Sequence, residues 1–152
     1  MKTKLKEKLW KMILFLGMLT IAFIAQGNSN KAFAASKKYV YMTSMVKYID
    51  EESTFGQCNK ITLKGKKLTL KGSLLRGKSE NAVLDGRYKS LRYKKRTFKL
   101  SSGCKFYSRG GDEGTKKIKK KKLIKIAKRY NGLALLVYTN KKGKVYKIIL
   151  SS

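Results

Sequence analysis

Apolar and polar residues alternate along much of the chain after residue 36, and this period of two predicts strands. Residues 37–49 are rich in β-branched and aromatic side chains and predict a first strand. Residues 58–77 predict a hairpin that turns at Gly65 and Lys66. Its apolar positions alternate with polar ones, namely Ile61, Leu63, Leu68 and Leu70.

Two further stretches carry strand patterns, and they are separated from the first hairpin by residues 78–95, an exposed connection of uncertain structure. Residues 96–108 predict a strand that is bulged or bent at Ser102 and Gly103. Its apolar positions are Phe98, Leu100, Cys104 and Phe106. Residues 133–152 predict a closing hairpin whose two sides are both largely apolar.

One helix is predicted, and it starts near Lys120. Its apolar residues fall on one stripe of about 100°, the width expected of a helix packed on a core: Leu123, Ile126, Ala127 and Tyr130. Ile118 and Leu123 occupy the two positions of a hydrophobic staple. Asn131 and Gly132 supply a left-handed stop. These signals favour a docked helix over one that lies on a membrane surface.

The order of elements predicts a mainly β (α+β) domain, with one helix before the C-terminal hairpin. Three strands, a helix and two strands is the chain order of the OB-fold, a small Greek-key barrel. We therefore expect an OB-like barrel of five to six strands, and a generic α+β sandwich remains the alternative. No linker is apparent after the first 34 residues, so we expect one domain. Within it, residues 35–56 are expected to form an N-terminal strand and loop, and residues 57–152 the OB-like barrel.

Several stretches carry a resemblance: "TFKLSSGCKFYS", the glycine-rich acidic loop after it, a helix ending "AKRYNGL", and a closing "GKVYKIIL" hairpin. Over about residues 59–150 they resemble small secreted bacterial domains, of Gram-positive type and unknown function, with OB-like barrels. The resemblance implies a fold and carries no catalytic motif.

The first 34 residues have the layout of a secretory signal peptide. A lysine-rich leader precedes an apolar run over residues 12–25, and Ala32 and Ala34 form the A-x-A pattern before a cut after Ala34. The rival interpretation is a retained membrane anchor, but the apolar run is shorter than the roughly 20 residues needed to span a bilayer. We therefore expect a secreted protein, extracellular or associated with the cell wall, that contacts the membrane only through this peptide.

Charge suggests the class of partner. The chain has 38 basic and 8 acidic residues and a net charge of +30. Residues 35–152 alone carry 32 basic and 7 acidic side chains. Such a field attracts polyanions. Outside a bacterial cell these include wall teichoic acid, acidic polysaccharide and extracellular nucleic acid. The alternative is that the charge only keeps the protein soluble.

Two basic stretches are candidate ligand sites. Lys119, Lys120, Lys121 and Lys122 crowd the start of the helix, where free N–H groups and the helix dipole favour an anion. The second stretch mixes cations with aromatic rings and has little apolar pattern to bury, which makes it a candidate ligand-facing strip, with a solvated loop as the alternative. It comprises Arg87, Tyr88, Arg92, Tyr93, Lys94, Lys95 and Arg96.

The residues argue against catalysis. The chain has no histidine, which removes the usual general base and the commonest metal ligand. Its acids lie in loop-like contexts, and we expect no catalytic residue, no cofactor and no metal. Cys58 and Cys104 are the only cysteines, so a disulfide is expected in a secreted chain, with two buried thiols as the alternative.

These observations predict a secreted, non-enzymatic module that associates with anionic wall or extracellular polymers, and no small-molecule substrate. The alternative is a structural or inhibitory domain that binds a surface protein and whose charge serves only solubility. A salt series separates the two, because binding through lysine and arginine weakens as salt rises.

Overall fold

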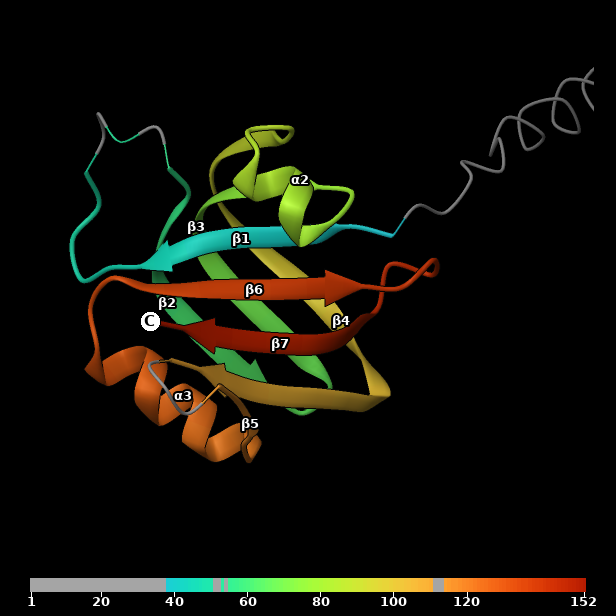
Figure 1. Ribbon diagram of the computed structural model, residues 1–152. Coiled ribbons are helices and arrows are strands. Elements are labelled where there is room, and N and C mark those ends of the chain that lie inside the picture. Colours follow the sequence, from blue (N-terminus) through green and yellow to red (C-terminus); the bar gives the residue numbers. More distant parts are fainter. Residues whose placement is uncertain (1–37, 51–52, 54, 111–113) are drawn as a thin grey trace, which may run out of the picture. The chain divides into compact units, whose positions relative to one another are not determined.

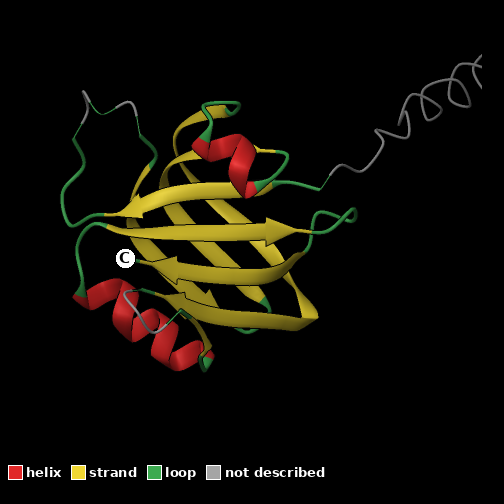
Figure 2. Cartoon of the chain, viewed as in Figure 1, coloured by secondary structure: helices red, strands yellow, loops and turns green. Residues whose placement is uncertain are grey.

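The computed structural model describes residues 38–50, 53, 55–110 and 114–152 (Figures 1 and 2). The expected signal peptide lies outside these residues. Ser36–Ser152 form one compact unit. In chain order its elements are β1 (Val40–Met45), β2 (Gln57–Lys64), β3 (Lys67–Gly77), α2 (Glu80–Leu84), β4 (Lys89–Arg109), β5 (Thr115–Lys117), α3 (Lys120–Arg129), β6 (Leu133–Thr139) and β7 (Val145–Ser151).

The fold is mainly β, as the alternating pattern predicts. The sheet has seven strands, more than the expected five to six. Strand β1 belongs to the same sheet as the rest, because it pairs with both β3 and β6. Residues 40–45 thus lie in the same sheet as the strands of residues 57–151. Neither described helix is long and apolar enough to span a bilayer.

The strand pairings form a ring. Strand β1 pairs antiparallel with β6, β6 antiparallel with β7, and β7 parallel with β4. Strand β4 then pairs antiparallel with β3, and β3 antiparallel with β1. Figure 1 shows β2, β3 and β4 crossing behind β1, β6 and β7. Buried apolar side chains from both layers belong to one core cluster.

Strand β2 continues the course of β1 along β3. Strand β1 pairs with the end of β3, at Val40 and Gly77, whereas β2 pairs with its first half. The two segments overlap over two residue pairs, where Ser44 and Met45 lie beside Gln57 and Cys58. A glycine permits this arrangement: a Cβ on Gly72 would lie 2.2 Å from the backbone oxygen of Gln57.

Strand β4 is long, and it pairs with β3, β7 and the short strand β5. Its first half pairs with β3, and its second half pairs with β7. The register shifts between Leu100 and Lys105, so the bend predicted at Ser102 and Gly103 is confirmed. Phe98 and Phe106, on either side of this bend, both pack against the core.

The core has two parts. The interior cluster collects fully buried side chains from β2, β3, β6, β7 and α3, among them Ile61, Leu68, Leu135, Ile148 and Leu123. A smaller cluster lies on the other face of β1, β6 and β7, where Val40, Leu136, Tyr138 and Ile149 are buried. This second cluster explains why the closing hairpin is apolar on both sides.

Helix α3 packs on the core cluster, as predicted. Its first residue is Lys120, Leu123 and Ala127 are buried, and Ile118 packs against the same cluster. The prediction was wrong for Tyr130, which is 51% exposed because the backbone is already extended there. Gly132 has the expected positive φ of 84°, and its N–H donates to the Met45 carbonyl, which ties the helix end to β1.

Residues 78–95 are more ordered than a loop. Ser79 caps helix α2 by accepting a hydrogen bond from the N–H of Ala82, and β4 begins at Lys89. Residues 115–117 form a short strand beside the end of β4, which the alternation did not predict. Figure 2 shows α2 and α3 at opposite edges of the strands.

Candidate anion-binding surface

Three adjacent strands carry the same outward pattern, lysine-x-threonine-x-lysine. The antiparallel register aligns these positions in three rows across β2, β3 and β4. We call this surface the lysine–threonine face. Its Lys60 row is Lys60, Lys71 and Lys95; its threonine row is Thr62, Thr69 and Thr97; and its Lys64 row is Lys64, Lys67 and Lys99.

All six lysines of the lysine–threonine face are exposed. Within the described part of the chain none of them forms an ion pair, since the ion pairs found there are Arg87 with Asp85 and Arg109 with Glu80. Like charges that lie directly opposite on neighbouring strands destabilise a sheet. The face therefore holds positive charge in a fixed arrangement that no acidic side chain of the described residues compensates.

An open depression of about 780 Å³ lies over this face. Lysines of both rows line it, together with Thr62 and Thr69. The Oγ1 atoms of Thr69 and Thr97 share a hydrogen bond of 3.1 Å, which links the strands at the centre of the face. Because lysine side chains are longer than threonine side chains, the two lysine rows flank a neutral floor that carries hydroxyl groups.

The predicted anion site at the start of α3 lies next to this face. The Lys120 ammonium donates a 2.7 Å hydrogen bond to the Gly65 carbonyl, in the turn between β2 and β3. Lys120 is thus half-buried and engaged, whereas Lys119, Lys121 and Lys122 are exposed. The first turn has no acidic residue and no side-chain cap. The helix start therefore adds positive charge beside the Lys64 row.

The seven residues of the predicted ligand strip do not lie together on one surface. Arg87 pairs with Asp85 at 2.7 Å and Tyr88 is 37% exposed, both outside the lysine–threonine face. The other five residues lie in strand β4 rather than in a loop, so their side chains do not form one surface.

Within β4, Lys95 is part of the Lys60 row, and Tyr93 lies beside that row with Lys71 Nζ 5.9 Å from its ring centroid. Arg92 and Lys94 are exposed. Arg96 is held by the backbone, because its guanidinium donates to the carbonyls of Gly72, Arg92 and Lys94 at 2.9, 2.6 and 3.3 Å.

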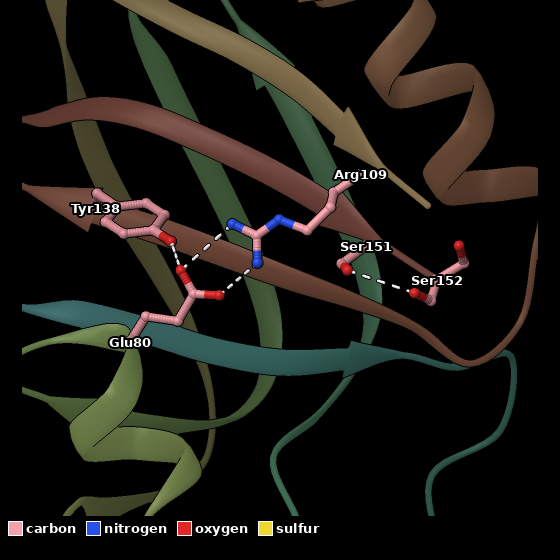
Figure 3. A network of polar contacts seen from close by, with 5 residues as sticks. All are labelled: Glu80, Arg109, Tyr138, Ser151 and Ser152. Carbon is pink, nitrogen blue, oxygen red and sulfur yellow. Dashed lines mark hydrogen bonds and ion pairs between the residues drawn. The ribbon is translucent and has the colours of Figure 1, made fainter. Parts of the chain in front are cut away.

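A second polar cluster joins α2, β4 and β6 (Figure 3). Arg109 Nη1 lies 2.5 Å from Glu80 Oε1, and the Tyr138 hydroxyl donates to the other carboxylate oxygen. Lys147 Nζ lies 3.8 Å from the Tyr138 ring centroid. Glu80, expected in a loop, is in fact the first residue of α2.

The cations and hydroxyl around Glu80 fix its charge state. The hydrogen bond from Arg109 lowers the pKa of Glu80, with a further contribution from Tyr138. Burial and the bond to Glu80 raise the pKa of Tyr138. The carboxylate is therefore ionised and satisfied by its partners, an arrangement suited to holding the helix against the strands.

The expected bridge between Cys58 and Cys104 is not formed in the structure, which holds both as free thiols. The Cys58 thiol is fully buried in β2 and lies 3.3 Å from the Lys60 carbonyl, to which it donates. Cys104 packs half-buried against the core, and burial raises its pKa to about 11. Both behave as small apolar residues, the alternative considered from the sequence.

The threonine row and most of the lysines that flank it were not identified from the sequence as a candidate site, although the sequence contains a repeated motif that marks them. The motif lysine-x-threonine-x-lysine occurs at 60–64, 67–71 and 95–99. A period of two predicts that the three polar residues of each motif share one face of a strand. Only the strand register shows that the three motifs lie side by side.

Comparison of the chain with models of protein families, with curated protein sequences and with solved structures finds no match. Function is therefore inferred from the chemistry and placement of the described residues.

Proposed function

We propose that this protein is a non-enzymatic module that binds anionic polymers through its lysine–threonine face. The observation that carries the proposal is the alignment of six exposed lysines in two cross-strand rows, none of which pairs with an acidic side chain among the described residues. Such rows cost the fold stability and concentrate positive potential at one place. A bound polyanion removes that cost.

Charge that served solubility alone would need no alignment, because solubility depends on net charge rather than on register. Alternating signs or a spread of lysines over the surface would keep the protein dispersed without like charges opposite one another. The aligned rows therefore favour polyanion binding over the alternative of a protein partner with purely solubilising charge.

We also propose that the ring of strands is an OB-like barrel. In support, three strand regions precede α3 and two follow it, if β1 and β2 count as one interrupted strand and the three-residue strand β5 is set aside. OB-folds bind oligonucleotides and oligosaccharides on the face of their second and third strands. With that count, β3 and β4 are these strands, and they carry four of the six lysines of the lysine–threonine face.

The proposed setting is outside the cell or in the cell wall, and it rests on the signal-peptide pattern of residues 1–34. The anionic polymers of that setting are wall teichoic acid, acidic polysaccharide and extracellular nucleic acid. No catalytic role is proposed, since the most enclosed carboxylate described, Glu80, is occupied by Arg109 and Tyr138.

A salt gradient tests the proposal. The protein is applied to an immobilised anionic polymer, and a variant with glutamine at all six lysines of the lysine–threonine face is compared with a matched control. The control has glutamine at six other exposed lysines: Lys47, Lys78, Lys125, Lys128, Lys141 and Lys142. Because the two variants have equal net charge, earlier elution of the first supports the proposal, and equal elution contradicts it.

A further inference from the structure

The dimensions of the lysine–threonine face limit what it can hold. Lys60 and Lys64 are four residues apart on β2, so the two lysine rows stand about 14 Å apart at about 3.4 Å per residue. Three strands at a spacing of about 4.8 Å give the depression a length of about 10 Å. An occupant that reaches the threonine floor must therefore be narrow, and the lysine rows would flank it on both sides.

A single extended chain fits these limits, and a nucleic-acid duplex does not. The grooves of double-stranded DNA alone measure about 12 and 6 Å across, so the whole duplex is broader than the space between the rows. It would rest on the lysine ammonium groups and leave the threonine hydroxyls without contact. A single chain that lies across the strands places its anions within reach of lysines from both rows.

The side chains on the floor of the face indicate which kind of single-chain polymer it would bind. Proteins that bind single-stranded nucleic acid stack the bases on aromatic side chains. Among the described residues no aromatic side chain lines the depression, whose centre is formed by Thr62 and Thr69. Tyr93 lies beside the Lys60 row but does not line the depression, and its hydroxyl donates to Asn59 Oδ1 at 3.3 Å. The face offers hydroxyl groups where a base-binding face would offer rings.

We infer that the lysine–threonine face binds a single chain of a polyol phosphate, a polymer of phosphodiesters joined by hydroxyl-bearing carbon units. This inference rests on the proposed function and names the ligand class of the same surface. The two lysine rows pair with the phosphates, to which lysine binds as a point charge. The threonine row exchanges hydrogen bonds with the hydroxyl groups and ester oxygens between them.

The test compares four probes of equal charge number: poly(glycerol phosphate), single-stranded oligodeoxythymidine, double-stranded DNA and polyglutamate. Binding of each is measured by titration over a series of salt concentrations. The variant has valine at Thr62, Thr69 and Thr97, which keeps the side-chain shape and the preference for strands but removes the hydroxyls. Circular dichroism and thermal unfolding check that it folds.

We expect poly(glycerol phosphate) to bind most tightly of the four. The valine variant should bind it about tenfold more weakly, as expected for the loss of hydrogen bonds. The slope of log affinity against log salt should not change, because that slope reports phosphate contacts and the lysines remain. Affinity for oligodeoxythymidine should be the same in both proteins.

The outcomes separate this inference from the proposed function. Tighter binding of oligodeoxythymidine, double-stranded DNA or polyglutamate than of poly(glycerol phosphate) would overturn the inference and leave polyanion binding intact. Equal affinity of the wild type and the valine variant for poly(glycerol phosphate) would do the same. If none of the four probes binds in a salt-dependent manner, the proposed function itself fails.

Discussion

The repulsion within a lysine row can be measured as a gain in stability when its central member is neutralised. Lys67 lies between Lys64 and Lys99, so Lys67→Gln removes two cross-strand repulsions. With the ammonium groups splayed to about 6.5 Å, each repulsion is about 0.6 kcal/mol in water before screening. At 0.15 M salt, with a Debye length of about 8 Å, it falls to about 0.3 kcal/mol.

Lys67→Gln should therefore raise the free energy of unfolding by about 0.5 kcal/mol at physiological salt and by about 1 kcal/mol at 0.01 M, where the Debye length is about 30 Å. At 1 M salt the gain should be below about 0.2 kcal/mol, because the Debye length is then about 3 Å. Urea unfolding at the three salt concentrations measures these differences, with an unchanged m-value showing that the same surface is exposed.

The control for this measurement is Lys142→Gln, at an exposed position in the turn between β6 and β7. It removes the same charge without a lysine opposite it on a neighbouring strand, so it reports the effect of net charge alone. A gain for Lys67→Gln that is no larger than the control, or one that persists at 1 M salt, would refute the cross-strand repulsion.

Further predictions concern the rest of the domain. Glu80→Gln should lower the free energy of unfolding by about 1–2 kcal/mol at pH 7, allowing for solvent screening. The folded protein holds the pKa of Glu80 below its usual value of 4.5. The loss should therefore disappear when urea titrations are carried from pH 7 to below that lowered pKa, where the wild-type carboxyl is protonated as well. Gly72→Ala should cost more than about 2 kcal/mol in the same assay, since its Cβ would meet β2 backbone atoms 2.2 and 2.6 Å away, and a neutral result would show that β2 can move aside. Alkylation of the unfolded chain without reductant should add two alkyl groups, at Cys58 and Cys104, and an unchanged mass would show that they are bridged instead. Glutamine at residues 119–122 should weaken retention on an anionic polymer more than glutamine at four lysines elsewhere, and equal losses would remove the helix start from the binding surface.

The elements that depend on local signals could be predicted from the sequence. The alternation around Gly65 and Lys66 located the first hairpin, and the turn lies there with a φ of 55° at Gly65. The start of α3 at Lys120 followed from the point at which lysines would enter its apolar stripe. These features could be found because a turn or a helix is determined by neighbours in the chain.

What depends on distant residues could not be predicted. Arg96, for example, is half-buried and donates a hydrogen bond to the carbonyl of Gly72 on β3, where the register between β3 and β4 shifts. No local pattern in the sequence specifies such a shift. Glu80 was assigned to a loop because its partners, Arg109 and Tyr138, are 29 and 58 residues away. A carboxylate with distant partners cannot be distinguished from a solvated one by sequence alone.

The candidate surface shows the same division. Each lysine-x-threonine-x-lysine motif predicts an exposed strand face by itself, but the rows exist only because β3 aligns with β2 on one side and with β4 on the other. The motif in β4 is 24 residues or more from the motif in β3, so its register follows from the fold rather than from a turn. The sequence predicted a basic protein, and the structure locates the aligned charge.

Lysine footprinting tests polymer binding at the lysine–threonine face most directly. The protein is treated with an amine-reactive label, with and without poly(glycerol phosphate), and the labelling rate of each lysine is read by mass spectrometry. We expect protection of the six lysines of the two rows and unchanged rates at Lys47, Lys78 and Lys142, which are also exposed but lie outside the face. Uniform protection of all lysines, or protection confined to residues outside the two rows, would contradict the proposed binding surface.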